Sequence, residues 1–140
     1  MNWLLTAGTL LQLIGSGQTA ARQWANAIDA RSIRTSAISV ALATAKIETQ
    51  RNAAVRKYLE TDLYTLLDRI KADSGLGPLG FELPHAMMWA HLCMDASIPG
   101  VGQVERQVYA TAMHEGLAVV ETARPEHAAL QALGVTIHAL

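Results

Sequence analysis

Two glutamates stand where the sequence predicts the boundaries of secondary-structure elements. Glu105 opens a helix predicted over Glu105–Glu115, and Glu121 directly follows an apolar strand predicted over Leu117–Val120. The helix has apolar residues three and four positions apart, and the strand has no polar alternation, which is typical of a strand covered by helices on both faces. Carboxylate oxygens are preferred ligands of hard divalent cations, so the chemistry these two residues could supply is metal binding.

The rest of the chain must supply the elements that position such a site. We predict four further strands and six further helices along the sequence. The strands are Asn2–Leu5, Ser32–Ile38, Phe81–Leu83 and Val135–His138, and the helices are Leu10–Ile14, Thr19–Ile28, Ser39–Glu48, Asn52–Ile70, Pro84–Cys93 and His127–Leu133. Right-handed crossovers between such units give a mostly parallel sheet of roughly five strands inside a three-layer α/β/α domain that spans residues 1–140.

Open parallel sheets form their sites beyond the carboxyl ends of the strands. Three segments of this chain follow predicted strands in that way: Thr6–Gly8, Ser36–Ser39 and Glu121–Ala123. The start of the helix at Glu105 can face the same edge. We therefore expect a functional site where these segments meet.

Composition and charge exclude several classes of protein. With 140 residues and a formal charge of -1, the chain lacks the basic excess typical of proteins that hold nucleic acid by charge alone. RNA contact would need a local patch, for which the candidates are Arg22, Arg31, Arg34, Arg51, Arg56 and Lys57.

No apolar run reaches the length of a membrane span, and the first residues lack the basic segment of a signal peptide. We expect a cytoplasmic protein with Cys93, its single cysteine, as a reduced thiol.

Two other motifs carry less information. The segment Gly15–Ala20 resembles the glycine fingerprint of dinucleotide-binding proteins, but that interpretation requires Thr9–Ile14 to be a strand and an acid to end the next one. The strand at Ser32–Ile38 ends without an acid. The five histidines include no pair four residues apart and no cysteine partner at zinc spacing, so we expect no metal site from them.

The whole chain resembles the PIN-domain family, in particular VapC-type toxins. The first strand of that family ends in a motif whose aspartate aligns with Thr6, and its second acid, early in the helix after the second strand, aligns with Ala45. Its third acid opens a later helix and aligns with Glu105, in the segment Glu105-Arg106-Gln107-Val108-Tyr109-Ala110-Thr111-Ala112. Its fourth polar position follows a strand and aligns with Ala123. Only Glu105 keeps a carboxylate.

The resemblance implies a metal-dependent ribonuclease fold whose active site is degenerate. Alanine supplies no ligand and threonine only a neutral hydroxyl, so we expect no bound Mg²⁺ or Mn²⁺ and no other cofactor. We predict a non-catalytic or weakly active PIN-like protein that binds RNA, an antitoxin-like protein or its own copy, with a homodimer implied by the family. Two alternatives stay open: an active Mg²⁺- or Mn²⁺-dependent endoribonuclease that uses Glu48 and Glu121 with Glu105 as displaced acids, and a nucleotide-binding module built on Gly15–Ala20.

Overall fold

Four short strands form one parallel sheet at the centre of the molecule. The structure, a computed structural model, describes all 140 residues. The strands are β1 (Trp3–Leu5), β2 (Ile33–Arg34), β3 (Ala118–Glu121) and β4 (Ile137–Ala139), in the spatial order β2-β1-β3-β4. β1 and β3 are the two inner strands, and Leu5 lies opposite Val120 in their register. The predicted parallel α/β sheet is therefore confirmed.

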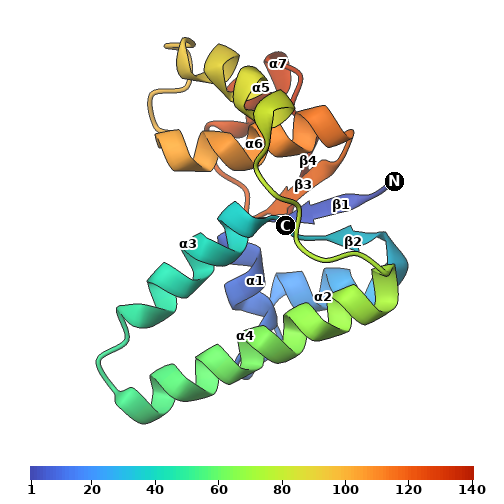
Figure 1. Cartoon of the computed structure of the whole chain (residues 1–140), viewed down its shortest axis with the longest axis vertical. Helices are drawn as coiled ribbons and strands as arrows, with labels where there is room; N and C mark the ends of the chain where they lie inside the picture. The colour runs from blue at the N-terminus through green and yellow to red at the C-terminus, as the bar shows by residue number, and fades with distance from the viewer.

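Seven helices cover the two faces of this sheet. They are α1 (Ala7–Leu13), α2 (Ala20–Ala27), α3 (Ala37–Glu48), α4 (Ala53–Ser74), α5 (Leu83–Cys93), α6 (Gln103–Glu115) and α7 (His127–Ala132), with a 3₁₀ turn, η1, at Ala30–Ser32. In Figure 1, α1 to α4 lie on one face and α5 to α7 on the other, which gives three layers. None of the helices is both long and apolar enough to span a membrane.

Alternation along the inner strands divides the core in two. Leu4 and Val119 pack with the layer formed by α5, α6 and α7, whereas Leu5 and Val120 pack with α1, α3 and α4. All four side chains are fully buried. Burying a leucine or valine side chain contributes about 1.5–3 kcal/mol, so these residues fix the inner strands between the two helical layers.

Hydroxyl side chains set where several helices begin, and they account for differences from the predicted boundaries. The Thr6 hydroxyl accepts a hydrogen bond from the Thr9 amide, so α1 begins at Ala7 and not at Leu10. The Ser36 hydroxyl does the same for Ser39, so α3 begins at Ala37. The strand predicted over Ser32–Ile38 is consequently only two residues long, because the chain turns into α3 immediately after it.

The strand predicted over Phe81–Leu83 is wrong. Leu83 is already the first residue of α5, and the Glu82 amide donates to the imidazole of His85 at 2.9 Å, which closes the first turn of that helix. The only strand-like pairing in this region is an isolated parallel bridge between Ser36 and Leu79. The sheet accordingly has four strands, not five.

Candidate functional site

A cavity of about 580 Å³ opens at the carboxyl ends of β1 and β3. Its lining includes Thr6, Glu105, Glu121 and Ala123, which are far apart in the sequence. β1 and β3 run side by side and in parallel, so the residues that follow them meet at one edge, as expected. A second cavity, of about 550 Å³, lies between α2 and α4, and its lining includes none of Thr6, Ala45, Glu48, Glu105, Glu121 and Ala123.

Glu105 lies on the first turn of α6 and is paired with an arginine. The Arg124 guanidinium donates from Nη1 to Glu105 Oε2 at 2.6 Å, from Nε to Glu126 Oε2 at 3.1 Å, and from Nη2 to the Gly100 carbonyl at 3.0 Å. Partial burial opposes the charged form of Arg124, but the hydrogen bonds to Glu105 and Glu126 outweigh it and hold the pKa of Arg124 above its usual range. The one carboxylate retained at a family position is thus neutralised by the chain itself.

Glu121 ends β3 and is almost completely buried. Its Oε1 accepts a hydrogen bond from the Tyr109 hydroxyl at 2.5 Å and lies 2.8 Å from His127 Nε2. Burial, followed by the bond to Glu121, raises the pKa of the Tyr109 phenol well above its usual value. Glu121 therefore ties α6 and α7 to the end of β3.

Thr6 occupies the position of the first family acid, where it has a structural role. Its hydroxyl caps α1, and it lies 3.1 Å from the hydroxyl of Thr9. Thr9 in turn donates to the Val120 carbonyl at 2.6 Å. These bonds join the start of α1 to β3 and supply no negative charge.

The other predicted positions also contribute no charge for a cation. Ala45 is on the exposed face of α3, between Leu42 and Lys46, which both line the cavity. Lys46 brings a positive charge to the same edge. Glu48 is exposed and does not line the cavity; a hydrogen bond to Glu48 raises the pKa of Glu60, which places Glu48 beside α4.

This set of side chains does not fit Mg²⁺ or Mn²⁺. Such ions need several oxygen ligands in a near-octahedral shell, and their charge has to be balanced by carboxylates. Glu105 is already paired with Arg124, and Glu121 with Tyr109 and His127. Thr6 and Ala123 add no charge. No step of metal-dependent cleavage can be assigned to these residues.

The nucleotide-binding interpretation of Gly15–Ala20 is wrong. The segment before it belongs to α1, a helix, so the strand that the fingerprint requires is absent. The turn also points carbonyl groups inward: the Arg22 guanidinium donates to the carbonyls of Leu13, Gly15 and Gly17. A pyrophosphate needs backbone N–H donors, whereas this turn presents carbonyl acceptors that already bind a guanidinium.

Arg124, Tyr109 and His127 were missed as site residues. Arg124 lies 19 positions after Glu105 and carries no motif, and Tyr109 reads as one more apolar position on the buried face of its helix. His127 begins a predicted helix, and nothing in its sequence context indicated that it binds Glu121. Only the meeting of α6, β3 and α7 brings the three side chains together.

Comparison with known proteins places this fold. No family model matches the sequence, and no curated protein matches it. Among solved structures, the chain is similar to one in the crystal structure of FitAcB from Neisseria gonorrhoeae (TM-score 0.76, 20% identity, 96% of this chain and 95% of that one). It is also similar to a chain of VapBC2 from Rickettsia felis bound to a DNA fragment from their promoter (0.79, 14%, 100% and 99%). A third similar chain belongs to VapBC-5 from Mycobacterium tuberculosis, a member of the VapBC family of toxin-antitoxin systems (0.69, 17%, 99% and 97%).

These likenesses extend over essentially the whole of each chain, at identities of 20% or less. They confirm the predicted fold, and the resemblance to VapC-type proteins holds at the level of that fold.

Proposed function

We propose that this chain is a non-catalytic protein of the PIN-like fold that works by binding an antitoxin-like protein. The observation that carries the proposal is the pairing of Arg124 with Glu105, because it places a fixed cation where a nuclease of this fold would need a divalent one. The proteins similar in structure include members of toxin-antitoxin complexes, which supports a protein partner of that class. Cys93 as a free thiol is consistent with a cytoplasmic location.

The positive charge of Arg124 beside Glu105 argues against a metal-dependent active site at this edge of the sheet. Guanidinium and divalent cation would compete for the same carboxylate, and the guanidinium is held by three acceptors at once. Displacing it from Glu105 would remove one of these three acceptors from a partly buried cation, which costs free energy. The alternative of an active endoribonuclease built on Glu48, Glu105 and Glu121 lacks support, since Glu48 does not line the cavity and Glu121 is engaged.

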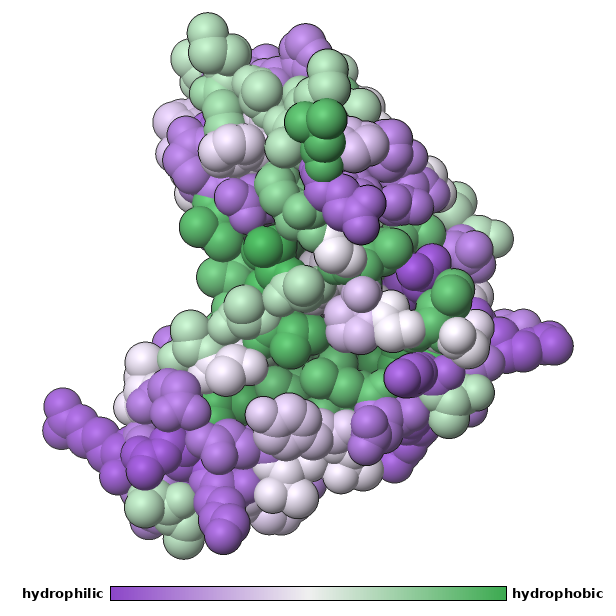
Figure 2. All heavy atoms as spheres, in the orientation of Figure 1, coloured by the Kyte–Doolittle hydropathy of each residue, from purple (hydrophilic) through white to green (hydrophobic).

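Apolar surface supports the choice of a protein as the partner. Leu83 begins α5, Met87 lies within it and Met94 directly follows it, and they have 74%, 63% and 87% of their surface exposed. Figure 2 shows further apolar surface in the hollow that lies between α3 and α6. Methionine and leucine side chains gathered in this way are typical of surfaces that bind other proteins. A second copy of the chain is the other occupant we propose for this surface.

RNA is the second candidate ligand, favoured by one observation. Lys46 lines the cavity of about 580 Å³ at the carboxyl ends of β1 and β3. A smaller cavity of about 350 Å³ is lined by Lys46 and Arg51. These side chains could contact phosphate groups without a metal ion. Because the formal net charge of the chain is -1, we rank RNA below a protein partner.

A metal and cleavage assay tests the absence of catalysis. We expect wild-type protein and Glu105→Gln to give the same Mn²⁺ titration and the same lack of Mg²⁺- or Mn²⁺-dependent RNA cleavage. A matched variant restores the family pattern: Thr6→Asp, Ala45→Glu, Ala123→Asp and Arg124→Ala together should create Mn²⁺ binding that depends on Glu105. Cleavage by the wild type that disappears in Glu105→Gln would overturn the proposal.

Co-purification tests the partner. We expect a stable complex with an antitoxin-like protein co-expressed with this chain, and we expect Met87→Glu to weaken it while Tyr64→Glu, on an exposed face of α4, leaves it unchanged. Sedimentation of the isolated chain distinguishes self-association, which Met87→Glu would then reduce. Equal binding by both variants would exclude this face as the binding surface.

A further inference from the structure

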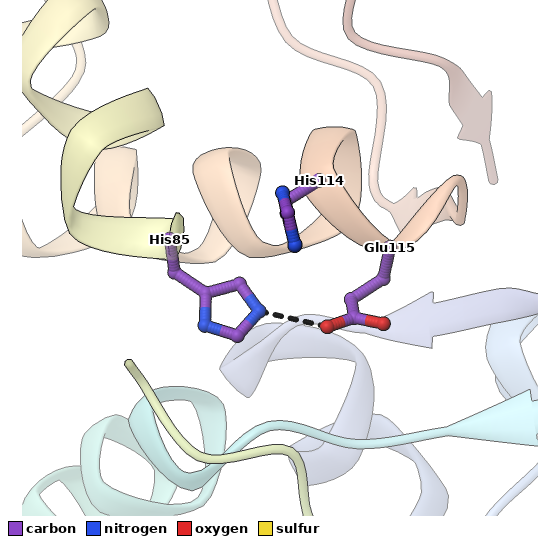
Figure 3. A group of neighbouring side chains, drawn as sticks. All are labelled: His85, His114 and Glu115. Carbon is purple, nitrogen blue, oxygen red and sulfur yellow. Dashed lines mark hydrogen bonds and ion pairs between the residues drawn. The ribbon is translucent and has the colours of Figure 1, made fainter. Parts of the chain in front are cut away.

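Three side chains that could ligate a transition metal meet at the opposite end of α6 from Glu105. His85 comes from the first turn of α5, and His114 and Glu115 are the last two residues of α6 (Figure 3). One ligand atom from each residue lies within 4.8 Å of the other two. Ten residues of helix separate Glu115 from Glu105, which is about 15 Å, so this cluster is distinct from the cavity described above.

The geometry points to a binding site for Zn²⁺ or a similar borderline cation such as Co²⁺. Two imidazoles and one carboxylate form a ligand set that such ions prefer and that Mg²⁺ does not. His85 is buried, with 4% of its surface exposed, while His114 and Glu115 are exposed. The buried imidazole would anchor the ion and the two exposed side chains would close on it from the solvent side. The fourth position would then be left to water.

Electrostatics favour a cation at this place. The carboxyl end of α6 carries the negative end of the helix dipole, and Gly116, in the left-handed conformation at φ 68°, ends the helix directly after Glu115. Glu115 has no arginine or lysine partner; its one ion pair is with His85 Nε2 at 2.8 Å. This contrasts with Glu105 at the other end of the helix, which Arg124 neutralises.

Metal binding at His85 has a structural consequence at the start of α5. The Nδ1 atom of His85 accepts the Glu82 amide hydrogen at 2.9 Å, so in the neutral ring the proton is on Nε2, which donates to Glu115. Coordination through Nε2 requires that proton to move to Nδ1. The neutral ring keeps one proton in total, but the hydrogen bond from the Glu82 amide is lost. The ion would therefore loosen the first turn of α5.

Titration of the full chain with ZnCl₂ tests the site. We expect one Zn²⁺ per chain, with His114→Ala and Glu115→Gln each weakening the affinity about tenfold or more, as the loss of a direct ligand should. His91→Ala removes an exposed histidine of α5 outside the cluster and should change the affinity less than about twofold. Co²⁺ should give the visible absorption of a four-coordinate ion in the wild type and lose it in His114→Ala. Absence of binding, or equal loss in His91→Ala, would overturn the site.

An amide signal tests the role of His85 without a variant at that buried position. In two-dimensional ¹⁵N spectra, Zn²⁺ should shift the Glu82 amide and increase its rate of hydrogen exchange, and His114→Ala should abolish both effects. Mg²⁺ at the same concentration should cause neither. If Zn²⁺ binds and the Glu82 amide stays unchanged, His85 is not a ligand and the proposed three-residue site is wrong.

Discussion

Arg124 Nη1 lies 2.6 Å from Glu105 Oε2, although the two residues are 19 positions apart and come from different elements. The contact joins the first turn of α6 to the loop after β3. It balances the charge of Glu105 with a cation that belongs to the chain itself. The chemistry available to Glu105 at this edge is decided by that pairing.

Replacing Arg124 by glutamine should lower the free energy of unfolding by about 1 kcal/mol, because the partly exposed contact with Glu105 and the bond to the Gly100 carbonyl are both lost. Urea denaturation followed by circular dichroism measures the change. Arg31→Gln is the matched control: Arg31 also pairs with an acid, Asp29, but 81% of its side chain is exposed, so no measurable change is expected. Equal effects for both variants would contradict the structural role of Arg124.

Arg106 should be the arginine whose loss destabilises the protein most. It is 5% exposed, and its guanidinium donates to the carbonyls of Leu92, Ile98 and Val101, which fixes the loop between α5 and α6. Arg106→Met would leave these buried carbonyls without donors and should cost about 3 kcal/mol or more. Arg69→Met, at an exposed position of α4, should have little effect. Denaturation midpoints of the two variants would decide the matter.

Tyr109 should make stability fall in alkaline solution. Burial and the bond to Glu121 raise the pKa of its phenol in the folded chain, whereas the unfolded chain releases that proton near pH 10. Because the unfolded state then binds fewer protons, the contribution of Tyr109 is fully present below pH 10. It is lost as the pH rises further, with a slope of about 1.4 kcal/mol per pH unit.

Urea titrations at pH 9, 10 and 11 measure that slope. Tyr109→Phe should flatten it, although the variant also loses the hydrogen bond to Glu121 and begins from a lower stability. Tyr64→Phe, at a residue with 68% of its surface exposed, should keep the wild-type slope. A slope unchanged by Tyr109→Phe would mean that another group causes the alkaline loss.

Thr6 should matter for stability, although it aligns with the first acid of the PIN-domain pattern. Its hydroxyl caps α1, so Thr6→Ala should cost about 1 kcal/mol and Thr6→Ser should cost much less, because serine keeps the capping oxygen. Thermal unfolding of the two variants gives the comparison. Equal stabilities for alanine and serine would show that the cap contributes nothing.

The sequence determined the elements whose signals are local. The unbroken apolar run of β3, the three-and-four spacing of α6 and the glycine that ends α6 are signals carried by neighbouring residues, and each was predicted close to its observed place. The edge at which Thr6, Glu105, Glu121 and Ala123 meet was also predicted, because parallel strands end at the same edge and the start of the helix at Glu105 can face it. The short helix-capping segments were harder, because a hydroxyl such as that of Ser36 suits the end of a strand as well as the start of a helix.

Only the tertiary structure decided what those residues do. Three contacts bring together side chains from different elements: the Arg124–Glu105 pair, the bonds of Glu121 to Tyr109 and His127, and the cluster of His85, His114 and Glu115. No spacing rule connects such residues, because their distances depend on how the sheet is ordered and on which face each helix packs. Local periodicity fixes elements, whereas charge pairing and metal ligation depend on the exact approach of one element to another.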